Sequence, residues 1–140
     1  MTIEETQKYA EKLAASAAPD RRIFALVGDL GAGKTTFSGF FLRALGVTEP
    51  VTSPTFVIMK KYALAHLQFV HAYHIDCYRL KNPEELLSLG FAEIIADKKN
   101  IILIEWADRM RESLPPEAVW VDFAHAAETE RTISVRSAEL

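Results

Sequence analysis

The sequence has little of several features that define whole classes of protein. Its 140 residues include one cysteine, Cys77, so an internal disulfide is excluded. No apolar run approaches the roughly 20 residues that span a membrane, and the N-terminal residues are acidic, unlike those of a signal peptide. We find no repeat, low-complexity tract or linker. We therefore expect a cytoplasmic protein, with no membrane association and with one domain over residues 1–140.

Positive charge is also scarce. Lys and Arg total 16 against 19 acidic residues, which gives a formal net charge of -3. Proteins that bind nucleic acid unaided usually carry a basic surplus. We therefore expect no direct binding to DNA or RNA, unless basic residues gather in a local patch. Hydrophobic residues make up 49% and charged residues 25% of the chain, which is typical of a globular domain with one core.

Helical and strand patterns alternate along the chain. Uninterrupted apolar runs over residues 23–27 and 101–104 predict buried parallel strands. The other predicted elements are an amphipathic helix over 3–17, a helix over 35–45 that Gly46 ends, strands over 56–62 and 69–75, a helix that starts at Asn82-Pro83, and strands over 118–123 and 132–135 around a loop of 124–131. This order favours an α/β fold in three layers, with helices on both faces of a largely parallel sheet and a C-terminal strand pair.

A phosphate-binding motif joins the first predicted strand to the helix after it. Gly28-Asp29-Leu30-Gly31-Ala32-Gly33-Lys34-Thr35 matches G-x-x-x-x-G-K-[ST]. Its glycines allow backbone N–H groups to surround phosphate, and the helix that follows presents its positive end. Lys34 can reach the β- and γ-phosphates of ATP, and the Thr35 hydroxyl can ligate Mg²⁺. Thr36 is either a second hydroxyl near the phosphates or an ordinary residue of the first helical turn.

Acidic residues at strand ends are the expected partners of such a loop. Glu105 follows a buried strand, at the sheet edge where ligands bind in doubly wound folds, and could hold Mg²⁺. Asp76 ends another strand and could orient the attacking water, or could cap a local turn. His74 lies on the same strand face, where a packed histidine is the more usual role. Trp106 is either a core aromatic or a contact near the nucleotide.

The segment Ser53-Pro54-Thr55 lies between the motif helix and the next predicted strand. In nucleotide switches this connection often carries a hydroxyl that contacts Mg²⁺ and the γ-phosphate. Thr55 is the first candidate and Ser53 the second, and a rigid proline turn is the alternative. The remaining histidines have no ligand spacing with Cys77, so no zinc site is predicted.

Taken together, these segments resemble the bacterial TsaE (YjeE) family. The resemblance covers residues 6–136 and rests on four motifs in order: the phosphate loop through Phe37, then Ser53-Pro54-Thr55-Phe56, His74-Ile75-Asp76-Cys77-Tyr78-Arg79-Leu80 and Ile104-Glu105-Trp106. A phosphate loop alone is common, whereas this combination is much more specific. Cys77 stands where the family more often has leucine, and Ala107 where it has proline. Both changes concern local packing.

The resemblance implies a P-loop NTPase-like fold, ATP and Mg²⁺ as cofactors, and roles for individual residues. Thr35 and Glu105 would bind Mg²⁺, and Asp76, Lys34 and Glu105 would serve hydrolysis. Thr55 would belong to a switch-like loop that contacts the nucleotide. The implied nucleotide-binding residues are Thr6, Gly31, Ala32, Gly33, Lys34, Thr35, Thr36, Thr55, Trp106 and Arg131.

The resemblance also implies partners and a process. The family provides the ATPase needed to form threonylcarbamoyladenosine at adenosine 37 of tRNAs that read codons beginning with A. It works with proteins of the TsaB and TsaD type, through which tRNA is met indirectly. We expect Mg²⁺-dependent ATP hydrolysis that is weak alone and stimulated by the partners. The alternatives are a small-molecule kinase, a guanine-nucleotide switch and a non-catalytic nucleotide-dependent scaffold.

Overall fold

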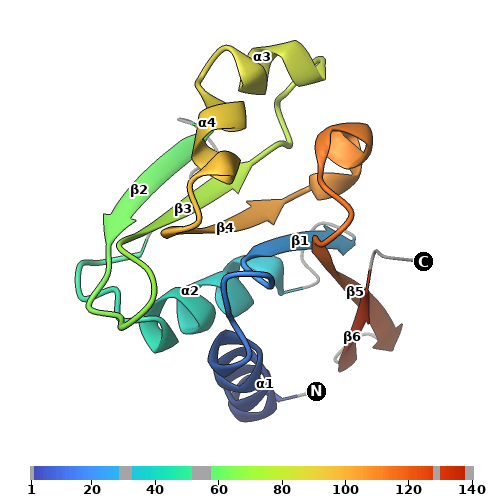
Figure 1. Cartoon of the computed structure of the whole chain (residues 1–140). Helices are drawn as coiled ribbons and strands as arrows, with labels where there is room; N and C mark the ends of the chain where they lie inside the picture. The colour runs from blue at the N-terminus through green and yellow to red at the C-terminus, as the bar shows by residue number, and fades with distance from the viewer. Residues whose placement is uncertain (1, 29–32, 52–57, 128–129, 138–140) are drawn as a thin grey trace.

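The computed structural model describes residues 2–28, 33–51, 58–127 and 130–137, and it arranges them as a sheet between two helical layers (Figure 1). Along the chain the elements are α1 (Ile3–Ala15), β1 (Ile23–Gly28), α2 (Lys34–Ala44), β2 (Met59–Ala63), β3 (His71–Asp76), α3 (Pro83–Leu87), α4 (Phe91–Ala96), β4 (Asn100–Glu105), the 3-10 helix η1 (Ala107–Ser113), β5 (Val119–Ala127) and β6 (Glu130–Ser137).

The strand order is β2-β3-β4-β1-β5-β6. The four inner strands, β3, β4, β1 and β5, run parallel, and the two edge strands pair antiparallel with their neighbours. This confirms the predicted largely parallel α/β sheet and its C-terminal strand pair. Because the inner strands are parallel, the carboxyl ends of β1, β3 and β4 meet at one edge of the sheet.

Helices cover both faces of the sheet (Figure 1). On one face α1 and α2 pack through residues such as Leu13 and Phe41 onto Phe24 and Leu103. On the other face α3, α4 and η1 form a second apolar cluster with the alternate strand residues, including Ile104. The three-layer prediction is therefore confirmed. Within the described part of the chain, none of the helices combines the length and apolar composition needed to cross a membrane.

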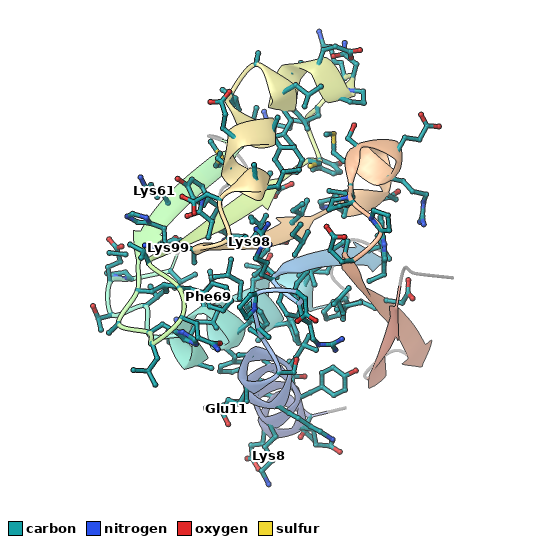
Figure 2. The ribbon with its side chains drawn as sticks, viewed as in Figure 1. Lys8, Glu11, Lys61, Phe69, Lys98 and Lys99 are labelled. Atoms are coloured by element: carbon teal, nitrogen blue, oxygen red, sulfur yellow. The ribbon has the colours of Figure 1, made fainter. Side chains whose placement is uncertain are left out.

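The first helix is amphipathic, as its sequence pattern predicts. Figure 2 shows Lys8 and Glu11 on the side of α1 turned away from the sheet, whereas Ala10 and Leu13 are buried. The helix begins at a capping box in which the Thr2 hydroxyl accepts the Glu5 N–H and the Glu5 carboxylate accepts the Thr2 N–H. It ends at Ala15, two residues before the predicted end.

Other element boundaries also differ from those predicted. β2 begins at Met59, after Ile58 adopts a positive φ of 69°, so the strand predicted over 56–62 starts later; residues 56 and 57 lie outside the described residues. β5 and β6 extend through most of the predicted loop 124–131, because their ladder continues past a bulge to the pair Ala127 and Glu130. The elements α4 and η1 were not predicted.

Two predicted stop and start signals are confirmed. Asn82 caps α3 by accepting the Glu85 N–H, and Pro83 occupies the first turn. Gly46 ends α2 at a φ of 108°, with its N–H donated to the Arg43 carbonyl.

A buried arginine joins the start of β1 to α4 and β4. The Arg22 guanidinium donates to the Asn100 carbonyl at 3.3 Å and to the Ile95 carbonyl. Burial lowers the pKa of Arg22, and the charges of Glu117 and Asp97 partly oppose that shift. The contact anchors the end of the sheet opposite the site described next.

Candidate nucleotide and magnesium site

The candidate site lies where β1 passes into α2. Gly28 ends β1 at a φ of 141°, a backbone conformation that favours glycine. A Cβ atom at Gly28 would lie 2.3 Å from the carbonyl oxygen of Phe123 on β5, so the position also lacks room for a side chain. Gly33 precedes α2 at a φ of 96°. Because glycine has no side chain, it does not cap the first N–H groups of the helix. These are the features that a phosphate-binding turn requires.

Lys34 is the first residue of α2 and is 5% exposed. Its Nζ donates to the Gly28 carbonyl at 2.6 Å and lies 4.1 Å from the centre of the Trp106 ring. The ammonium group therefore lies against the start of the glycine-rich turn. A phosphate bound in that turn would compete with a carbonyl oxygen for a cation that is already in place.

Glu105 meets the start of α2 from the end of β4. Its Oε1 is 3.5 Å from the Thr35 hydroxyl, and its Oε2 is 3.2 Å from the Ser38 hydroxyl. Its Oε2 is also 2.6 Å from His74 Nε2. Sequence reasoning predicted that Thr35 and Glu105 come together, and the structure confirms their proximity. It missed Ser38, although Ser38 follows Lys34 by one helical turn and so shares its face.

The donor set of Thr35 and Glu105 fits Mg²⁺. This ion prefers hard oxygen ligands, and proteins commonly hold it with one or two side chains while phosphates and waters complete the shell. Within the described residues, no group of three or more His, Cys, Asp and Glu side chains could hold a metal ion without such help. The pair therefore fits a magnesium ion that arrives with a nucleotide.

Asp76 lies beside Glu105, because the two residues are paired in the register of β3 and β4. Asp76 is 4% exposed, and its Oδ1 accepts the Tyr78 N–H at 2.8 Å. The turn-capping role that the sequence left open is thus confirmed. A role in orienting water is compatible with the position at the same sheet edge, and it stays a prediction.

Trp106 lies directly after Glu105 in a left-handed conformation, with a φ of 58°. Its ring centre is 5.0 Å from that of Tyr78 and lies beneath the Lys34 ammonium group. An aromatic residue with positive φ is uncommon and is worth a functional explanation. The ring contacts Lys34 at the start of α2, so Trp106 belongs to the candidate site.

For the remaining predicted residues, the structure gives a position but no contact that supports a role in nucleotide binding. Thr6 is buried on α1, and its hydroxyl donates to the Thr2 carbonyl, a contact within the helix. Thr36 is exposed in the first turn of α2, and Arg131 is a residue of β6 paired with His125. Four predicted positions lie outside the described residues: Gly31, Ala32, Ser53 and Thr55.

The amino-acid sequence matches the model of one protein family over nearly the whole length of the chain. The model of the family described as threonylcarbamoyl adenosine biosynthesis protein TsaE matches residues 1–133. The chain belongs to the TsaE family. This confirms the resemblance that the four sequence motifs indicated.

Individual relatives agree with the family match. The chain is 40% identical over 131 residues to the tRNA threonylcarbamoyladenosine biosynthesis protein TsaE of Bacillus subtilis, over 94% of this chain and 78% of the relative. It is 39% identical over 133 residues to the TsaE protein of Rickettsia felis, over 94% of this chain and 74% of the relative. The crystal structure of Bacillus subtilis YdiB is similar, with a TM-score of 0.79 and 35% identity over 99% of this chain and 82% of that one.

Proposed function

We propose that this protein is an ATPase required to form threonylcarbamoyladenosine at position 37 of tRNAs that read codons beginning with A. The observation that carries the proposal is the approach of Thr35, at the start of α2, to Glu105 at the end of β4, with the Lys34 ammonium group over the ring of the adjacent Trp106. Membership of the TsaE family supplies the process, and it supports this role over that of a small-molecule kinase. The proposed cofactors are ATP and Mg²⁺.

In the proposed reaction, the oxygen of a water molecule bonds to the γ-phosphorus of ATP. The bond between that phosphorus and the β,γ-bridging oxygen breaks, and ADP leaves with its electron pair. Of the two protons of the water, one stays on the inorganic phosphate and one passes to solvent. Lys34 would leave the Gly28 carbonyl and donate to the β- and γ-phosphate oxygens. Mg²⁺, held by Thr35 and Glu105, would neutralise charge on those phosphates. Asp76 would hold the attacking water in line.

We propose that the partners are proteins of the TsaB and TsaD type, which would meet the tRNA themselves. This agrees with a net charge of -3, because an acidic chain gains little from direct contact with phosphates. A phosphate loop without a well-placed stabilising cation is often a slow catalyst. The partners are therefore expected to raise the rate of hydrolysis.

The test is Mg²⁺-dependent ATP hydrolysis, measured with and without the two partner proteins, for wild type, Glu105→Ala and Asp76→Ala. We expect slow hydrolysis by the wild type alone and stimulation by the partners, with both variants losing the stimulated rate. Equal turnover with and without partners would contradict the proposal. Full stimulation of either variant would remove that residue from the proposed mechanism.

A further inference from the structure

A buried histidine contacts the carboxylate that is proposed to bind Mg²⁺. His74 lies on β3, and its side chain points to the α2 face of the sheet, where Glu105 also lies. It is 1% exposed, and its Nε2 is 2.6 Å from Glu105 Oε2. Strand alternation accounts for the face that both residues share, but the contact itself depends on the pairing of β3 with β4. None of the roles proposed above uses His74.

The direction of this hydrogen bond follows from the two groups. A carboxylate that binds Mg²⁺ is ionised and only accepts, so in the proposed site the proton of this hydrogen bond lies on His74 Nε2. Among the described residues, Nδ1 of the same ring is buried without a hydrogen-bond partner. That atom is left as the bare acceptor of the Nε2–H tautomer. A proton on Nδ1 would instead leave a buried donor unsatisfied and would remove the donor that faces Glu105.

Ser38 also approaches Glu105 Oε2. Its hydroxyl has one proton, which either the Lys34 carbonyl or the Glu105 carboxylate can accept. The Ser38 hydroxyl is 2.7 Å from the Lys34 carbonyl and 3.2 Å from Glu105 Oε2. The shorter contact is the usual bond of a helical serine to the carbonyl one turn earlier, and it takes the proton first. His74 is therefore the stronger donor to Glu105.

We propose that His74 is a positioning residue that fixes the orientation of the Glu105 carboxylate for Mg²⁺. With Oε2 held by His74, Oε1 is directed to the Thr35 hydroxyl, 3.5 Å away. The inference rests on the proposed function, because it needs Glu105 to be a magnesium ligand. Loss of a hydrogen-bond partner behind a metal ligand typically lowers metal affinity by about 10–100-fold.

Two substitutions of similar polarity separate positioning from packing. In His74→Gln, the side-chain amide nitrogen can reach the place of Nε2 and still donate to Glu105. In His74→Asn, the shorter side chain places its amide near Nδ1, out of reach of Glu105. His71→Asn is the matched control, because His71 lies on the same strand, faces the opposite side of the sheet and is half-buried.

The measurement is calorimetric binding of a non-hydrolysable ATP analogue, at increasing Mg²⁺ and again in EDTA, with thermal unfolding of each variant. We expect His74→Asn to need about 10–100-fold more Mg²⁺ than wild type for the same affinity, with binding in EDTA unchanged. His74→Gln and His71→Asn should behave as wild type. An equal loss with and without Mg²⁺, or no loss in His74→Asn, would overturn the proposal.

A second measurement decides the matter if His74→Asn does not fold. Nitrogen NMR of the wild-type imidazole should show a proton on Nε2, and a proton on Nδ1 alone would overturn the inference. Failure of the proposed function has a different result, since the wild type itself would then bind the analogue equally with Mg²⁺ and with EDTA. That outcome would overturn both proposals, whereas failure in the variants alone would overturn only the role of His74.

Discussion

The two faces of the central sheet differ most at the carboxyl ends of the strands. On the face covered by α2, β3 and β4 end in the buried polar residues His74, Asp76 and Glu105. On the face covered by α3, α4 and η1, the alternate residues Ile75 and Ile104 are apolar and fully buried. The same two strands therefore supply functional groups to one side and apolar packing to the other.

This difference places the candidate site on one face of the sheet and a purely apolar core on the other. A buried carboxylate is costly unless it accepts hydrogen bonds, and Glu105 obtains them from β3 and α2. The apolar face has no such requirement and can contribute through burial alone. Substitutions on the two faces should therefore change different measured quantities, and the first two of four predictions test this.

The largest effect is expected on the apolar face. Phe91 on α4 is fully buried, so Phe91→Ala should lower the free energy of unfolding by about 3–5 kcal/mol through lost burial and the cavity that remains. Urea unfolding measures the change, and the folded variant should still bind ATP with the wild-type affinity. Leu89→Ala is the control, because Leu89 is 44% exposed and should lose far less. A stable Phe91→Ala variant with weakened ATP binding would contradict the separation of the two faces.

The next effect is expected at the phosphate loop. Lys34→Met keeps the length of the side chain but removes the ammonium group, so ATP hydrolysis should fall by about 10²–10³-fold, as when one group that stabilises transition-state charge is lost. The free energy of unfolding should change much less than in Phe91→Ala. Hydrolysis assays and urea unfolding provide the two readings. Lys8→Met, on the outer side of α1 (Figure 2), is the control and should leave both unchanged. Wild-type hydrolysis by Lys34→Met would remove Lys34 from the mechanism.

A smaller effect should be visible by fluorescence. The Lys34 ammonium group lies 4.1 Å from the Trp106 ring centre, a contact that contributes roughly 0.5–2 kcal/mol depending on exposure. Binding of ATP should draw Lys34 to the phosphates and change the emission of Trp106. Trp120→Phe leaves Trp106 as the one tryptophan, since the chain has 2, and isolates the signal. The signal should disappear in Trp106→Phe. An emission change that persists there would place its origin elsewhere.

The smallest effect concerns the first turn of α1 and depends on pH. Hydrogen bonds from the Thr2 backbone and hydroxyl lower the pKa of Glu5, chiefly the backbone bond. A carboxylate with a lowered pKa contributes stability above its usual pKa, and loses that contribution as the pH falls through the pKa of the folded state. Thermal unfolding of wild type and Glu5→Gln should therefore differ near neutral pH and converge in acid.

Glu4→Gln is the control for this titration, because Glu4 lies in the same turn but outside the capping box. A difference between wild type and Glu5→Gln that grew in acid would contradict the direction of the Glu5 shift.

The elements that sequence predicted well have strong local patterns. β1 and β4 are uninterrupted apolar runs, and α2 follows a glycine-rich turn and ends at Gly46, so composition and spacing locate all three. The approach of Thr35 to Glu105 was predicted because parallel strands end at one edge. The three elements follow from local patterns, and the approach of Thr35 to Glu105 follows from a general rule of parallel sheet topology.

The features that the sequence did not predict depend on tertiary contacts. α4 has 6 residues, too few for a periodic pattern, and is stabilised by burying Phe91 against the sheet. The β5–β6 ladder continues through polar residues because pairing, not composition, holds it together. The contact of His74 with Glu105 joins residues 31 positions apart, and it requires the register of β3 against β4.

The clearance at Gly28 has a consequence for protein engineering. Because the Phe123 carbonyl of β5 occupies the space that a Cβ would need, Gly28, the first residue of the phosphate-binding motif, is fitted to the C-terminal hairpin. Transplanting residues 28–35 alone into another parallel sheet would leave that fit behind. A transferable unit would have to include β5 as well, because β5 supplies the surface against which Gly28 packs.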